Sequence, residues 1–296
     1  MNTSDLSLGA YGRRRSVSFA SRRRSAAGML VPLTIFALLF LSACKQSKPE
    51  PKPQAPHEDK LVIFAAASLR NAFTSMGEDF KRSHPGVAIR FNFAGTQELR
   101  TQLEQGAESD VFASADQRHM GELVKAGRVT EPVTFARNEP VLVVAKESAG
   151  KILSVADLPK ATRVIIGVPE VPIGRYTLQI LDRASVTLGA DFRARVEAKV
   201  VSRELNVRQV FSKVSLGEAD VGFVYRTDAQ GAEDRVKLVA IPSDINVIAD
   251  YPIANVTTAK HLALARSWVA YVLSVGGQNA LRKAGFMAPS GSAKTP

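Results

Sequence analysis

Residues 61–68 read LVIFAAAS, a short apolar run that ends in small residues and a serine. A continuous apolar run of this length is typical of a strand that is covered on both faces. Apolar residues then recur at helical spacing from Leu69 to Phe80. That spacing predicts a helix that starts near Ser68, where a hydroxyl can cap it. The stretch therefore predicts the first strand–helix unit of an α/β protein.

The same alternation continues along the chain. Further strands are expected over residues 87–93, 111–113, 141–145, 164–168, 221–225 and 253–256. Helices are expected over residues 68–82, 96–105, 116–126, 176–188, 207–216 and 259–275. Ser154 and Asp157 have the spacing of a capping box. Strands that alternate with helices predict parallel-type sheets with helices on both faces.

Composition excludes several classes of protein. The chain has 296 residues, of which 45% are hydrophobic and 23% are charged, which is enough apolar material for a packed core. A disordered chain is excluded on the same grounds. The single Cys excludes a disulfide framework and a Cys-based zinc site.

The N-terminal segment has the features of an export signal. Six arginines precede the apolar run Met29–Leu41, which is too short to span a bilayer and suits a signal peptide. The only Cys follows small residues in Leu41-Ser-Ala-Cys44, an order that resembles a bacterial lipobox. We expect residues 1–43 to be a lipoprotein signal peptide and Cys44 to be lipidated. The alternative is an ordinary signal peptide, and the export route stays open.

The segment after Cys44 differs from the rest of the chain. Residues 45–60 contain four prolines and almost no apolar side chain, so residues 44–60 are predicted to be a Pro-rich tether. Residues 289–296 are predicted to be a flexible tail. The formal net charge is +11, but the arginines before Met29 contribute about half of it, so no nucleic-acid partner is expected.

Short polar or small residues follow several predicted strands. Ligands of parallel α/β sheets lie at the carboxyl ends of strands, where helix N-termini present free N–H groups. Ser68, Thr96 and Tyr225 offer hydroxyls at such junctions, and residues 172–174 and 206–208 precede predicted helices. Each alone is more simply a cap or a turn. Because all are neutral hydrogen-bond donors, together they indicate an anion site.

Five motifs in this order resemble the molybdate-binding proteins of ABC importers. They are FAAASL (64–69), FAGT (93–96), AESDVFASAD (107–116), PEVPIGRY (169–176) and GFVY (222–225). The resemblance covers about residues 61–286. It implies a two-lobed, type II periplasmic-binding-protein fold with a ligand cleft between the lobes.

The resemblance also implies a set of ligand-binding residues. Ser68 and Thr96 would donate hydroxyls from the first lobe, Ile173 and Val207 would donate backbone N–H groups from the second, and Tyr225 would donate its phenolic O–H. The family often has consecutive serines where this chain has Gly95-Thr96, so a methyl group is added beside the anion. Ile173 is also bulkier than the residue often found at its position.

The chemistry of these donors narrows the ligand. Phosphate keeps a proton near neutral pH and benefits from an acceptor such as a carboxylate, which none of the five positions supplies. Molybdate, tungstate and sulfate are fully deprotonated dianions. The preference for molybdate, possibly tungstate, rests on the resemblance, and sulfate is the alternative. Arg175 and Arg208 lie beside the proposed contacts, and each is expected to face solvent or brace a nearby carboxylate more readily than to hold the anion.

We expect residues 61–138 and 250–288 to form the first lobe and residues 139–249 the second. The dianion would favour a closed form by bridging both lobes, which would then dock on an ABC permease. The expected protein is a monomer on the periplasmic or cell-surface side, held to the membrane through Cys44, with no cofactor and no metal cation.

Two other functional classes fit the sequence less well. A secreted hydrolase that uses Ser68 is a remote alternative, because no Gly-x-Ser-x-Gly frame surrounds that serine and the four histidines form no metal-ligand pair. The effector domain of a transcription regulator would need an N-terminal helix-turn-helix in place of the export signal. The protein is therefore not expected to be an enzyme.

Overall fold

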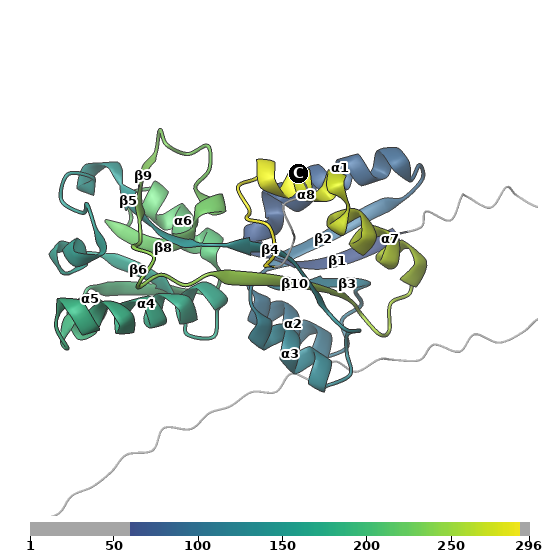
Figure 1. The fold of residues 1–296 in the computed structure, drawn as a ribbon, viewed down its shortest axis with the longest axis horizontal. Helices are drawn as coiled ribbons and strands as arrows, with labels where there is room; N and C mark the ends of the chain where they lie inside the picture. Colours follow the sequence, from purple (N-terminus) through teal and green to yellow (C-terminus); the bar gives the residue numbers. More distant parts are fainter. Residues whose placement is uncertain (1–59, 291–296) are drawn as a thin grey trace, which may run out of the picture. The chain divides into compact units, whose positions relative to one another are not determined.

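The computed structural model describes residues 60–290. Within this range the strands form two five-stranded sheets, which we call the sheets of the first and second lobes (Figure 1). The signal peptide, Cys44 and most of the predicted tether lie outside the described residues, as do residues 291–296 of the predicted tail. None of the helices between residues 60 and 290 combines the length and apolar character needed to cross a bilayer.

The first sheet has the strand order β2-β1-β3-β10-β4. Its strands are β1 (Lys60–Ala66), β2 (Ala88–Ala94), β3 (Val111–Ala113), β4 (Val133–Asn138) and β10 (Ala249–Asn255). Helices α1 (Arg70–Ser83), α7 (Leu262–Leu273) and α8 (Val275–Lys283) lie on one face, and α2 (Thr96–Glu104) and α3 (Gln117–Lys125) lie on the other (Figure 1). A short 3-10 helix, η1 (Ala67–Leu69), joins β1 to α1.

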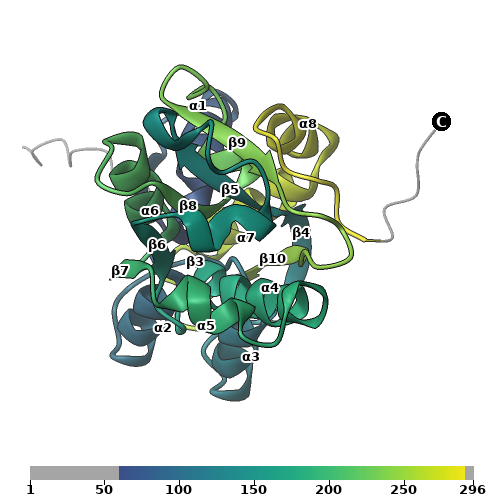
Figure 2. The same ribbon diagram turned by 90° about the vertical axis from the view of Figure 1, so that its left-hand side faces the viewer.

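The second sheet has the order β7-β6-β8-β5-β9. Its strands are β5 (Pro140–Ala145), β6 (Val164–Gly167), β7 (Val200–Glu204), β8 (Val221–Tyr225) and β9 (Val236–Ala240). Helices α4 (Pro172–Leu188) and α5 (Phe192–Glu197) cover one face and α6 (Val207–Ser215) the other (Figure 2). Three 3-10 helices complete this part: η2 (Lys146–Ser148), η3 (Val155–Lys160) and η4 (Arg226–Asp228).

The expected α/β class with helices on both faces is confirmed, but both sheets are mixed. In the first sheet β10 runs antiparallel to β3 and β4, and in the second β5 runs antiparallel to β8 and β9. The other four strands of each sheet are parallel to one another. The two antiparallel strands are the ones that begin just after the chain passes from one sheet to the other, at Asn138–Pro140 and Ala240–Ala249.

Local sequence patterns missed several short elements and placed the start of one helix too late. Strands β4, β7 and β9 and helices α5 and α8 were not expected, since they are short or carry mixed apolar and polar residues. Helix α4 starts at Pro172, one turn before the predicted Tyr176, because proline is well suited to the first helical position. The capping box at Ser154 and Asp157 is present, with the Asp157 carboxylate accepting from the Ser154 N–H at 3.0 Å.

Aromatic packing attaches the C-terminal helices to the first sheet. Trp268 of α7 is fully buried, and its ring meets Phe73 and Phe80 of α1 in edge-to-face contacts at 5.4 Å. Such contacts stabilise beyond the area that they bury. The first lobe is therefore built from both ends of the described chain, with the second sheet inserted between β4 and β10.

Candidate functional site

A small cavity lies between the carboxyl ends of strands from both sheets. Its volume is about 10 Å³, roughly the space that one water molecule needs. The first lobe lines it with residues 66–68, 94–96 and Ala115, and the second with residues 171–173, 206–207 and Tyr225. All five residues expected to bind a ligand (Ser68, Thr96, Ile173, Val207 and Tyr225) line this cavity, and each is buried.

Four helical N-termini bring backbone N–H groups to this cavity. Thr96 and Val207 are the first residues of α2 and α6, Ile173 is the second residue of α4, and Ser68 lies in η1 before α1. The first N–H groups of a helix have no acceptor inside the helix and carry partial positive charge. The ends of these helices therefore favour a negatively charged group.

Tyr225 contributes a buried hydroxyl that has no hydrogen-bond partner. It ends β8, its ring is 1% exposed, and its hydroxyl is buried without a hydrogen-bond partner. Burial raises the pKa of this phenol well above its usual value, so that it stays protonated and acts as a donor. A buried unpaired hydroxyl costs free energy, and a ligand that accepts its proton recovers that cost.

The hydroxyls of the first lobe already have neighbours. Thr96 Oγ1 accepts the Ala115 N–H at 3.2 Å, which leaves its proton free to donate. Ser68 Oγ lies 2.9 Å from the hydroxyl of Tyr251, a fully buried residue of β10. Sequence analysis did not find Tyr251, because it is 183 positions from Ser68 and no local motif marks it.

No charged side chain is among the described residues that line the cavity. Two buried carboxylates lie behind it, and each pairs with an arginine, as expected for Arg175 and Arg208. Arg175 donates to Asp116 at 3.0 Å, and Arg208 Nε lies 3.2 Å from Asp228. The cavity is therefore walled by neutral donors, while the nearby negative charges are balanced.

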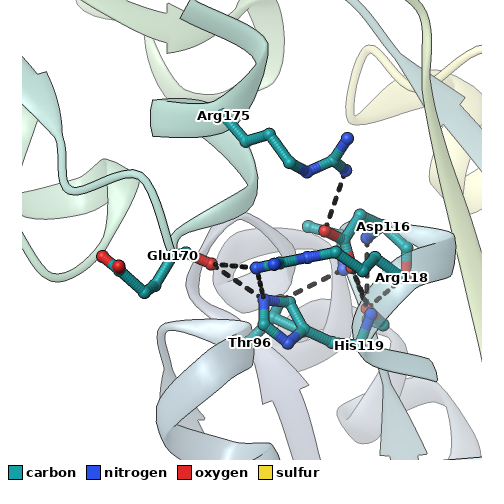
Figure 3. A network of polar contacts seen from close by, with 8 residues as sticks. Thr96, Asp116, Arg118, His119, Glu170 and Arg175 are labelled. Carbon is teal, nitrogen blue, oxygen red and sulfur yellow. Dashed lines mark hydrogen bonds and ion pairs between the residues drawn. The ribbon is translucent and has the colours of Figure 1, made fainter. Parts of the chain in front are cut away.

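The Arg175–Asp116 pair belongs to a network that joins the two lobes (Figure 3). Asp116 caps α3 by accepting the His119 N–H at 3.0 Å, and Arg175 reaches it from α4. Arg118 and His119 of α3 both donate to the Glu170 carbonyl, at 3.2 and 2.8 Å. Burial lowers the pKa of His119, which favours its neutral form.

A second group of contacts joins the lobes beside α2. The Gln97 side chain donates to the Leu205 carbonyl at 2.8 Å. A Cβ added to Gly95 would fall well inside contact distance of the same carbonyl, so the lobes approach closely only because residue 95 is glycine. Both groups of contacts hold the lobes together around the cavity.

A larger hollow of about 560 Å³ lies near the amino ends of β1 and β3. Its lining mixes basic and acidic residues, and Lys260 pairs with Glu108 at 2.5 Å. The Asp110 carboxylate there accepts the N–H groups of Val62 and His261. Its two carboxylates, Glu108 and Asp110, thus have partners within the first lobe, and the size of the hollow alone gives it no defined chemistry.

Known proteins resemble this chain over most of its length. The molybdate-binding protein ModA of Mycobacterium tuberculosis is 41% identical over 253 residues, which cover 84% of this chain and 93% of that protein. The putative ABC transporter substrate-binding lipoprotein YvgL of Bacillus subtilis is 30% identical over 88% of this chain and 96% of its own.

Solved structures show the same fold. The sulfate-binding protein SubI of Mycobacterium tuberculosis superposes with a TM-score of 0.71 at 21% identity, covering 79% of this chain and 88% of that one. This likeness confirms the expected two-lobed fold of periplasmic binding proteins. The family model for bacterial extracellular solute-binding proteins matches residues 61–287. With that match over most of its length, this chain belongs to the family of bacterial extracellular solute-binding proteins.

Proposed function

We propose that this protein captures molybdate, or tungstate, between its two lobes and delivers it to the permease of an ABC importer. One observation carries the proposal: the buried hydroxyl of Tyr225 has no partner and lines a cavity walled by neutral donors from both lobes. Such a wall suits a fully deprotonated dianion, since it offers no carboxylate to accept a proton from the ligand. The 41% identity to a protein named for molybdate binding supports the choice of anion.

The proposed binding step requires movement of the lobes. The cavity has room for about one water molecule, and a tetrahedral oxyanion is larger. The lobes would separate along the two segments that pass between the sheets, admit the anion and close on it. Because donors come from both lobes, the anion would stabilise the closed form through its differential contacts.

Binding without catalysis is part of the proposal. A serine nucleophile needs an adjacent general base. The hydrogen-bond partner of Ser68 is the phenol of Tyr251, and burial raises the pKa of that phenol well above its usual value. A protonated phenol does not remove a proton from serine, which argues against the hydrolase alternative.

The test is a thermal-shift and calorimetric titration of the purified protein with molybdate, tungstate, sulfate and phosphate. A ligand at about 100 times its Kd adds roughly 2.7 kcal/mol to the free energy of unfolding, which raises Tm by several degrees at this size. We expect a large rise with molybdate and tungstate and little with phosphate. A larger rise with sulfate would change the substrate, and no response to any of the four would overturn the oxyanion function.

Lipid anchoring through Cys44 is a separate part of the proposal. It rests on the sequence around that residue and on the similarity to a protein named as a lipoprotein. Acyl chains contribute about 0.8 kcal/mol per buried CH₂, so a multiply acylated Cys44 would hold the protein at a membrane. Mass spectrometry of the membrane-associated protein should show acyl mass at Cys44, and Cys44→Ala should release the protein. Size-exclusion chromatography tests the expected monomer.

A further inference from the structure

Two backbone carbonyls of the second lobe accept hydrogen bonds from the first lobe, and each lies just before a helix that starts at the cavity. The Leu205 carbonyl precedes α6 and accepts from the Gln97 side chain at 2.8 Å. The Glu170 carbonyl precedes α4 and accepts from His119 and Arg118 at 2.8 and 3.2 Å. Both contacts exist only while the lobes are closed. They differ in that an amide donor does not titrate, whereas an imidazole does.

The closed lobes bury the His119 ring in a setting that suits its neutral form. A carbonyl only accepts, so Nε2 carries the proton that it donates to Glu170. In the neutral ring Nδ1 then carries the lone pair, and among the described residues this atom has no hydrogen-bond partner. The residue is 2% exposed. A proton added to Nδ1 would therefore create a buried, charged donor without an acceptor, which costs free energy.

The positive charges beside the ring also oppose its protonation. Arg118 Nη2 lies 3.1 Å from His119 Nε2, because both groups point at the same carbonyl (Figure 3). Burial is the main cause that lowers the pKa of His119, and Arg118 and Arg100 of α2 add to this effect. Asp116 and the carbonyl of Glu170 oppose it. The carboxylate of Glu170 points away from the ring (Figure 3).

Separation of the lobes would reverse these conditions. The Glu170 carbonyl would leave His119, so that water could solvate Nε2, and Arg118 would no longer share an acceptor with the ring. Arg175 belongs to the second lobe, so its departure would leave the charge of Asp116 unbalanced beside His119. Water and a nearby carboxylate both stabilise an imidazolium ion. The open form is therefore the better proton acceptor.

We propose that His119 is a proton-sensitive positioning residue: uptake of one proton by its imidazole favours the open lobes and so promotes release of the bound anion. This proposal rests on the proposed function. His119 acts on the anion through Glu170 and the start of α4. Above the ordinary imidazole pKa of about 6.5 the ring is neutral in both forms and affinity is highest. Affinity falls as the pH drops below that value, because protonation favours the open form.

The experiment is a calorimetric titration of the full chain with dilute molybdate from about pH 8 to pH 5, on wild type and His119→Gln. Glutamine keeps an N–H donor for the Glu170 carbonyl, as Gln97 does for Leu205, and does not titrate. The ratio of the two Kd values at each pH cancels the protonation of the anion and of groups common to both proteins. The controls are Gln97→Ala and His84→Gln, which replaces a histidine at the end of α1. A melting curve for each protein confirms folding.

We expect the Kd of wild type relative to His119→Gln to rise about fivefold from pH 8 to pH 5, and by less than tenfold per pH unit, because one proton is involved. Arg118 is exposed, so screening limits the effect of its charge. Gln97→Ala should weaken binding by the same factor at every pH, and His84→Gln should follow wild type. A ratio that stays constant, or falls toward low pH, would overturn the inference.

A second measurement needs no substitution at His119. An NMR titration of the imidazole C–H signals in wild type should give this histidine a lower pKa with bound molybdate than without it. Replacing the other three histidines one at a time assigns its signal. An equal or higher pKa in the bound protein would also overturn the inference. Wild-type protein that binds neither molybdate nor tungstate at any pH would instead overturn the proposed function.

Discussion

The two lobes have the same strand order and meet the cavity at corresponding junctions. Strands β1 and β6 lead to Ser68 and Ile173, and strands β2 and β7 lead to Thr96 and Val207. Helices start at these places in both lobes, but the first lobe adds the hydroxyls of Ser68 and Thr96, whereas the second has the apolar side chains of Ile173 and Val207. Equivalent positions in one topology therefore supply different donors, because a helix start can offer either its backbone or a capping side chain.

The junctions after β3 and β8 differ in a way that affects how the lobes can separate. Asp116 follows β3 and Asp228 follows β8, and both carboxylates are buried and paired with arginine. Arg208 belongs to the same lobe as Asp228, whereas Arg175 reaches Asp116 from the opposite lobe. Separation of the lobes would break the Asp116 pair and leave the Asp228 pair intact. The Asp116–Arg175 pair should thus affect closure of the lobes. The Asp228–Arg208 pair should affect only the stability of the second lobe.

The largest expected effects come from two glycines, one with a close contact inside its own lobe and one with a close contact across the lobes. A Cβ at Gly174 would meet the carbonyls of Val168 and Gly167 in its own lobe, whereas a Cβ at Gly95 would meet Leu205 of the other lobe. Gly174→Ala should lower the free energy of unfolding by about 3 kcal/mol, since the clash has no relief within the lobe. Gly95→Ala should retain its stability and lose affinity about 10-fold or more, because separating the lobes relieves the clash.

Urea denaturation and anion titration of both glycine variants measure these two effects. A Gly95→Ala protein that binds with wild-type affinity would show that closure does not bring Gly95 and Leu205 together. The reverse pattern, with a destabilised Gly95→Ala protein, would place that contact within the rigid core of the molecule.

The second prediction concerns Asp228, whose pKa burial raises to about 6, although Arg208 opposes the rise. Between about pH 4 and pH 6 the folded protein keeps this proton while the unfolded chain has released it, so the contribution of Asp228 to stability is greatest at low pH and falls as pH rises. Relative to Asp228→Asn, wild type should lose about 2 kcal/mol of unfolding free energy from pH 4 to pH 7. Parallel pH profiles for the two proteins would contradict this.

The third prediction separates affinity from stability at Tyr225. Hydrogen bonds to a charged group contribute roughly 1.5–3 kcal/mol, so Tyr225→Phe should raise the Kd for the anion about 10- to 150-fold. The free protein should melt at the same or a slightly higher temperature, because the lost hydroxyl is buried without a partner. Calorimetry and melting curves measure both effects. Unchanged affinity would remove Tyr225 from the site.

The smallest expected effect is on the pair that bridges the lobes. Asp116→Asn keeps an oxygen to cap α3 and loses the charge that faces Arg175. Arg175 is 28% exposed and can rehydrate, so we expect a loss of about 1 kcal/mol, or about fivefold, expressed as faster anion release. Stopped-flow dissociation measures it.

The matched control for this pair is Asp182→Asn, which removes one of the two carboxylates that pair with Arg193 within the second lobe. Because both of its members move together, this pair should leave the release rate unchanged. Equal release rates for Asp116→Asn and wild type would mean that the bridging pair does not contribute to closure.

Local patterns predicted the elements that are long or strongly apolar. Strand β1 and helix α1 were evident because their apolar spacing extends over many residues. Strand β7 was missed, since Val200–Glu204 alternates exposed and half-buried residues at the edge of its sheet. The direction of β10 and β5 was also missed, because strand pairing depends on the path of the whole chain.

The sequence by itself determined the α/β class and the family resemblance, and the resemblance named five residues that line the cavity. The hydroxyls of Ser68, Thr96 and Tyr225 were also evident locally, because strand–helix junctions carry signals in the form of small residues, hydroxyls and helix starts. Only the tertiary structure decided that Tyr251 stands behind Ser68, that Arg175 pairs across the lobes and that Gly95 meets Leu205. The physical reason is that each of these contacts joins residues far apart in the chain. Their partners are chosen by how the sheets pack, and no local spacing records that choice.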